Sequence, residues 1–153
     1  AIMEQLDLKQ YGWHMLEDST NYDSHEWDIA HSARRFECGS PNMTGVHALH
    51  ASMTLIEEVG MPLIEQLVLE NSRFMIDYFL QRADRYQLIT PEPDNRHAGI
   101  ITVRPLNEST EFLFKMLASR HVMCALRGGG IRFSPHFYTP RKRLFSALEI
   151  LDS

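Results

Sequence analysis

The spacing of apolar residues predicts two consecutive helices in the middle of the chain. From Thr44 onward, apolar side chains recur every three or four residues, as they do on one face of an amphipathic helix. These residues are Val46, Leu49, Met53, Ile56 and Val59. Asn42 or Thr44 can cap the start of this helix, and Gly60 can end it. Because proline suits the first turn of a helix, a second helix is expected from Pro62 to about Arg85.

The remainder of the chain alternates short strand-like runs with helical ones. Apolar and β-branched residues predict four strands, in "YQLIT", "AGIITVRP", "HVMCALR" and "GIRFSPH". A helix capped by Asn107 or Ser109 separates the second run from the third, and Thr139 is expected to cap a last helix whose first residue is Pro140. This order predicts an α+β fold, in which helices cover a small, largely antiparallel sheet.

The first part of the chain has a different pattern. Residues 9–32 are polar and aromatic without periodicity, which is typical of a segment that lies on other protein. The chain also begins without an initiator methionine, inside a helix-like apolar pattern. We therefore expect a piece of a longer protein, with a connecting strap near its start.

Composition and charge narrow the class of protein. With 153 residues the chain has the length of one domain. Its formal net charge of -5 argues against a nucleic acid or an anionic membrane as main partner, and no apolar run reaches the roughly 18 residues that span a bilayer. Two distant cysteines, Cys38 and Cys124, favour free thiols in the cytoplasm, although a single bridge stays open.

Several motifs carry little chemistry. His47 and His50 have a spacing that can bind metal, but no third ligand accompanies them, so no metal site is expected. The glycines of "RGGG" lead into a strand-like run rather than a helix, which favours a hairpin turn over a phosphate loop. Neither cysteine has a neighbouring histidine and acid that would mark a nucleophile.

Arg132 is the strongest candidate for a functional residue. It lies inside an apolar strand directly after three glycines, where burial without a partner would be costly. Its stem could pack while its head reaches solvent or an internal carboxylate. Alternatively, its planar fork could bind the carboxylate of a ligand. The spacing alone leaves both interpretations open.

Two stretches read together resemble the signatures of class V aminotransferases. "RRFECGSPN" is similar to a signature of arginine, Phe-Glu, a small residue and Gly-Thr-Pro-Asn. "LRGGGIRFSPHFYTP" resembles Arg-x-Gly followed by Arg-x-Ser-x-x-x-Tyr-Asn-Thr, and "YGWH" resembles the Gly-Trp of the kynureninase-like branch. The family includes cysteine desulfurases, selenocysteine lyases, kynureninases and isopenicillin-N-epimerase-like enzymes. The resemblance covers the chain from about Tyr11.

The resemblance implies a homodimeric fold-type-I enzyme that depends on pyridoxal phosphate and acts on an amino acid. In this family the cofactor lysine belongs to a large domain that precedes the Gly-Trp segment, and none of Lys9, Lys115 and Lys142 has that context. The chain therefore resembles the C-terminal small domain, residues 33–153, preceded by a strap, residues 1–32, that belongs with the large domain. Alone, this piece is expected to hold no cofactor and to be inactive.

The resemblance also assigns roles to three residues. Arg132 would bind the α-carboxylate of the substrate. Ser40 stands where the family has a threonine that reaches the cofactor phosphate of the partner subunit, and Trp13 would pack near that phosphate. Thr139-Pro140 departs from the family's Asn-Thr.

The reaction itself stays open. Transamination, elimination, racemisation and desulfuration are all compatible with the resemblance, and desulfuration is less favoured because Cys124 falls in a predicted strand. The alternative is a stand-alone α+β ligand-binding or dimerisation module without catalysis.

Overall fold

The structure, a computed structural model, describes residues 2–153 apart from the side chain of Asp94. It divides into two compact units, which we call the N-terminal unit (Ala1–Thr54) and the C-terminal unit (Leu55–Ser153). The expected boundary between a strap and a small domain, at residues 32 and 33, stays a prediction.

The N-terminal unit contains little regular structure before its last helix. Three short 3-10 helices form at η1 (Ile2–Gln5), η2 (Trp13–Met15) and η3 (Ala33–Phe36), and an isolated antiparallel bridge joins Leu16 to Ile29. Its described buried apolar side chains are Met15 and Ala30, and the Ala30 amide donates to the Met15 carbonyl at 2.9 Å. The sparse apolar pattern of this segment thus gives only a minimal core.

The two predicted middle helices are present. Helix α1 spans Met43–Val59, and the Asn42 side chain caps it by accepting a hydrogen bond from the Gly45 amide at 2.9 Å. Gly60, with a φ of 85°, precedes α2 (Met61–Leu80). Helix α2 ends five residues earlier than expected, because the chain turns after Leu80 to enter the sheet, and the Tyr86 amide donates to the Arg82 carbonyl.

Four short strands form one antiparallel sheet in the C-terminal unit. They are β1 (Tyr86–Leu88), β2 (Ile101–Pro105), β3 (Ala125–Arg127) and β4 (Gly130–Phe133), in the order β1-β2-β4-β3. The prediction for the third strand was too long. His121 has a φ of 60° and the Val122 amide still bonds back to the Leu117 carbonyl, so the chain leaves the preceding helix late. Cys124 lies directly before β3 and not within it.

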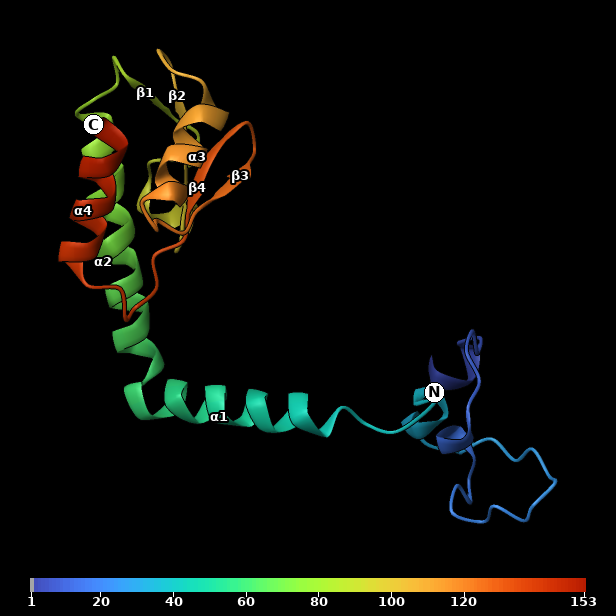
Figure 1. The fold of residues 1–153 in the computed structure, drawn as a ribbon. Helices are drawn as coiled ribbons and strands as arrows, with labels where there is room; N and C mark the ends of the chain where they lie inside the picture. The colour runs from blue at the N-terminus through green and yellow to red at the C-terminus, as the bar shows by residue number, and fades with distance from the viewer. Residues whose placement is uncertain (1) are drawn as a thin grey trace. The chain divides into compact units, whose positions relative to one another are not determined.

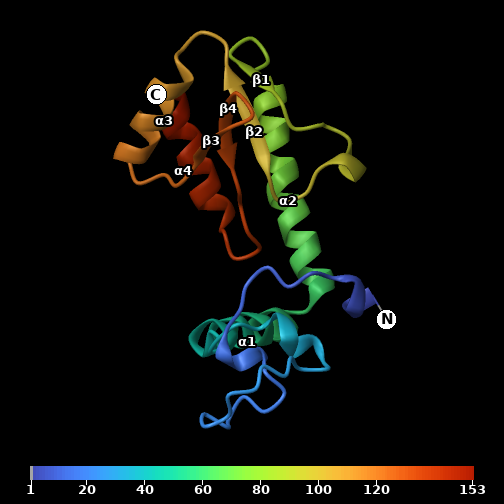
Figure 2. The same ribbon diagram turned by 90° about the vertical axis from the view of Figure 1, so that its right-hand side faces the viewer.

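Three helices share one core with this sheet. Helix α2 packs on β1 and β2, α3 (Thr110–Ser119) packs on β3 and β4, and α4 (Arg141–Asp152) packs on α2 and α3. Figures 1 and 2 show α2 and α4 alongside each other next to the sheet. The core comprises Met75, Ile76, Phe79, Tyr86, Ile101, Val103, Leu113, Leu117, Ile131, Phe133, Leu144, Leu148 and Leu151. The predicted α+β fold is confirmed.

Helix caps in this unit agree with the sequence except at α4. The Ser109 hydroxyl caps α3 by accepting a hydrogen bond from the Phe112 amide at 3.3 Å. At α4 the N-cap is Pro140, and Thr139 instead accepts a hydrogen bond from the His136 amide. Among the described residues, no helix has the length and apolar composition needed to cross a membrane.

Candidate functional site

The sheet presents one face to the core and three arginines on the other. Side chains alternate between the two faces of a strand, and the side chains of Ile131 and Phe133 enter the core. Arg132, which lies between them on β4, therefore belongs to the opposite face. Arg104 on β2 and Arg127 on β3 share that face by the same alternation and by the antiparallel register. We call this surface, carrying Arg104, Arg127 and Arg132, the arginine face.

Arg132 is half-buried, and its guanidinium forms no hydrogen bond to a described residue. The Nε atom is buried without a hydrogen-bond partner. None of the described acidic side chains forms an ion pair with Arg132. A buried unpaired N–H costs free energy. Of the two partners considered for a structural role of Arg132, solvent or an internal carboxylate, the carboxylate is missing among the described residues.

The position of Arg132 is fixed by the hairpin between β3 and β4. Gly128 and Gly129 have φ values of 59° and 76°, which side chains rarely adopt. The hairpin turn predicted for "RGGG" is therefore confirmed. The ladder pairs Arg132 with Thr102 on one side and with Ala125 on the other, so the arginine lies in the interior of the sheet.

Trp13 and Ser40 both lie in the N-terminal unit, near a close contact between two segments. A Cβ atom on Gly12 would lie 1.9 Å from the carbonyl oxygen of Cys38, so only glycine permits this approach. Gly12 directly precedes Trp13, and Cys38 lies two residues before Ser40. The contact therefore brings together the two segments that carry Trp13 and Ser40. Ser40 is exposed and Trp13 is 44% exposed. Arg132 belongs to the C-terminal unit.

The same unit holds buried nitrogen atoms that the sequence interpretation did not single out. Arg34 donates through NH2 to the Leu16 carbonyl at 2.8 Å, but its Nε is buried without a partner, as is the Nε of Arg35. His14 Nδ1 is also buried without a hydrogen bond, 3.6 Å from the Glu37 carboxylate. The sequence feature that could have indicated these nitrogen atoms is the adjacent pair Arg34-Arg35, which opens the stretch "RRFECGSPN".

These N–H groups suit an anionic group. A phosphate monoester offers only acceptor oxygens, and arginine and hydroxyl donors are its usual partners. The Ser40 hydroxyl makes no hydrogen bond to any residue that the structure describes. Arg34, Arg35 and Ser40 thus offer donors of the type that a phosphate binds, and all three belong to the N-terminal unit.

The implied cofactor also requires a lysine that can bond to it. Lys9 is exposed and pairs with Asp7 at 3.1 Å. Lys115 on α3 and Lys142 on α4 are also exposed. Among the described side chains, no group of three or more His, Cys, Asp or Glu residues is arranged to hold a metal ion.

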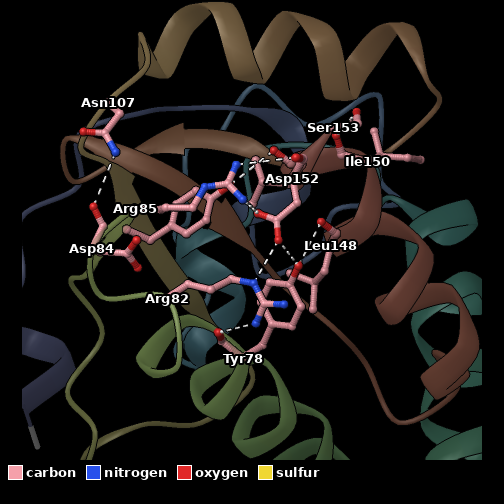
Figure 3. A network of polar contacts seen from close by, with 11 residues as sticks. Tyr78, Arg82, Asp84, Arg85, Asn107, Leu148, Ile150, Asp152 and Ser153 are labelled. Carbon is pink, nitrogen blue, oxygen red and sulfur yellow. Dashed lines mark hydrogen bonds and ion pairs between the residues drawn. The ribbon is translucent and has the colours of Figure 1, made fainter.

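A second polar cluster lies where α4 ends against α2 and β1 (Figure 3). The Asp152 carboxylate accepts hydrogen bonds from the hydroxyls of Tyr78 and Tyr86 and from Arg82 Nε, and it pairs with Arg85 at 3.1 Å. Burial opposes ionisation, but hydrogen bonds from the two tyrosines and the arginine charges outweigh it and lower the pKa of Asp152. Both carboxylate oxygens of Asp152 already accept hydrogen bonds from the protein, so they are not available to a ligand. The cluster therefore has a structural role, in which it links α4 to α2 and β1.

Comparisons with known proteins place the chain among aminotransferases. The family model for class-V aminotransferases matches residues 1–136. A curated relative, the uncharacterized aminotransferase YcbU of Bacillus subtilis (strain 168), is 26% identical over 117 residues, which are 76% of this chain and 30% of YcbU.

Two solved structures share the fold. The apo cysteine desulfurase from Thermococcus onnurineus NA1 superposes with a TM-score of 0.82 at 18% identity, over 99% of this chain and 40% of the desulfurase. A lysine-to-alanine mutant of C-DES, with glycine covalently linked to its PLP cofactor, gives a TM-score of 0.76 at 15% identity, over 99% of this chain and 39% of that one. The chain thus spans less than half the length of these relatives.

Proposed function

The chain belongs to the class-V aminotransferase family, and from this membership we propose that it is the C-terminal part of a longer enzyme that uses pyridoxal phosphate to act on an amino acid. The share of its relatives that it spans, 30% of YcbU and 40% of the desulfurase, supports the proposal. In this proposal the enzyme is a cytoplasmic homodimer that performs transamination, elimination or another lyase reaction. When bound, the cofactor supplies an electron sink for negative charge at the substrate α-carbon.

The observation that carries this proposal is the buried, unpaired Nε of Arg132. A carboxylate can accept two parallel N–H bonds from a guanidinium, and such charge-assisted pairs are stronger than neutral hydrogen bonds. The α-carboxylate of an amino acid would supply the missing acceptor. In this role Arg132 binds and orients the substrate, while the hairpin glycines hold its strand in place.

Ser40 and Trp13 would hold the cofactor of the partner subunit at its phosphate. The Ser40 hydroxyl would donate a hydrogen bond to a phosphate oxygen, and Trp13 would pack beside it. The unpaired Nε atoms of Arg34 and Arg35 add positive charge to the same unit. Because the three lysines are exposed and lack a cofactor context, the lysine that bonds the cofactor would come from the preceding part of the enzyme.

The test is to express the complete coding sequence, reduce the product with borohydride in the presence of pyridoxal phosphate, and map the modified lysine. We expect a lysine upstream of Ala1 to carry the cofactor, with Lys9, Lys115 and Lys142 unmodified. In the same protein, Arg132→Ala should lower kcat/KM for the amino-acid substrate by a factor of roughly 30 to 1000, because a charge-assisted fork is lost. Arg132→Lys should restore only part of the activity.

Two results would contradict the proposal. A coding sequence that begins near Ala1 would favour a stand-alone ligand-binding or dimerisation module. An equal loss of activity on the amino acid and on the matching amine without a carboxylate would make Arg132 a structural residue.

A further inference from the structure

The arginine face holds more positive charge than one substrate carboxylate requires. Arg127 pairs directly with Gly130 in the sheet, and the register of β2 places Arg104 opposite Gly130 on its other side. Adjacent strands lie about 4.8 Å apart, so the Cα atoms of Arg104 and Arg127 are about 10 Å apart across the glycine. Arg132 stands two residues along β4, diagonally about 7 to 8 Å from each.

Close ion pairs to these arginines are absent within the part of the chain that the structure describes. Arg104, Arg127 and Arg132 form no ion pair with a described acidic side chain. Three like charges at these separations repel one another. This local positive charge contrasts with the formal net charge of the whole chain, which is -5.

Arg104 is also held in place by its neighbours. Its Nε donates to the Gly129 carbonyl at 2.8 Å, and its NH1 donates to the Gln87 side-chain oxygen at 3.3 Å. A guanidinium has five N–H donors, so further donors remain for a ligand. Arg104 and Arg127 are both exposed, so a ligand can reach them.

We infer that the arginine face selects an amino acid with an acidic side chain. Its α-carboxylate would bind Arg132, and its second carboxylate would be bound by Arg104 and Arg127. The inference rests on the proposed function of Arg132 and adds the substrate class. An amino acid with a neutral side chain would pair only with Arg132 and would leave Arg104 and Arg127 without a carboxylate.

The experiment compares L-glutamate with L-glutamine, which have nearly the same shape but differ by one charge. Each is titrated at low ionic strength into the complete enzyme, expressed from the whole coding sequence and loaded with pyridoxal phosphate, and the arginine Nε–Hε resonances are followed by NMR. We expect both ligands to shift the Arg132 resonance and glutamate to bind more tightly. Because exposed charge pairs contribute little, each added arginine contact should be worth about two- to fivefold in affinity.

The variant Arg104→Gln/Arg127→Gln should remove most of the preference for glutamate and leave the affinity for glutamine unchanged. The matched control, Arg120→Gln/Arg143→Gln, removes the same charge from an exposed position directly after α3 and an exposed position on α4, and should leave the preference intact. Sulfate in excess should compete weakly, since its charge is not arranged as two separate carboxylates.

The outcomes separate this inference from the function on which it rests. If neither amino acid shifts the Arg132 resonance, the proposed function of Arg132 fails. If both shift it with equal affinity, only the acidic-substrate inference fails. An equal effect of the two double variants, or full displacement by sulfate, would show attraction of anions in general and would also overturn the inference.

Discussion

Replacing Asp152 by asparagine tests how strongly the polar cluster joins α4 to the rest of the C-terminal unit. The substitution keeps the shape of the side chain but removes its charge. It also replaces one acceptor oxygen with an NH2 group, which would face a donor of Tyr78, Arg82, Tyr86 or Arg85. The side chain of Asp152 is only 17% exposed, so water cannot easily replace the lost contacts.

The expected loss of stability is about 2 kcal/mol. A hydrogen bond to a charged group is worth about 1.5 to 3 kcal/mol, and the tyrosine bond at 2.7 Å from Tyr86 falls in this class. The arginines add less than about 1 kcal/mol each, because Arg82 and Arg85 are 34% and 44% exposed. Removing the negative charge at the C-terminus of α4 stabilises the helix by about 0.3 to 1 kcal/mol, which offsets part of this loss.

The assay is urea denaturation at neutral pH, with Asp77→Asn as the matched control. Asp77 makes an exposed pair with Arg73 at 3.9 Å, so its substitution should cost less than about 0.5 kcal/mol. Since the folded pKa of Asp152 is lowered, its contribution is present above the unfolded pKa near 4 and is lost as pH falls through the folded value. Equal effects of the two variants at neutral pH, or a difference that persists in strong acid, would refute this reasoning.

Two further predictions follow from tyrosine ionisation and from backbone packing. Burial and the hydrogen bond to a carboxylate raise the pKa of Tyr78 to about 12 and raise that of Tyr86 as well. Both tyrosines should therefore resist ionisation in a tyrosinate absorbance titration. The stability that they confer should be lost as pH rises from about 10, the pKa of an unfolded tyrosine, through the folded pKa values. Gly12→Ala should disrupt the N-terminal unit, because the new Cβ would lie 1.9 Å from the Cys38 oxygen; accelerated proteolysis of that segment would reveal it, and unchanged cleavage would contradict the contact.

The sequence predicted those parts of the fold that depend on local patterns. Apolar spacing and the residues around Gly60 defined α1 and the start of α2, and the glycines after Arg127 predicted a hairpin. The end of α2 was missed because it depends on where the chain must turn to pair β1 with β2. A local pattern does not contain that long-range information.

The candidate functional residues and the polar cluster divide in the same way. Arg132 could be found because a charge inside an apolar run is visible in the sequence. Arg104 joins it only through the register of β2 with β4, and the Asp152 cluster unites residues about 70 positions apart. Such groupings follow from sheet register and helix packing, which had to come from the structure.

The apolar surface of the N-terminal unit bears on the proposal of a longer enzyme. Its described buried apolar residues are only Met15 and Ala30. By contrast, its large aromatic side chains remain between 44% and 79% exposed at Trp13, Trp27, Tyr11 and Tyr22. Burial of an aromatic side chain is worth about 1.5 to 3 kcal/mol, so this segment gains little stability from its own contacts. Association with further protein would bury these rings, in the same unit that carries Ser40, the residue proposed to bind the cofactor phosphate.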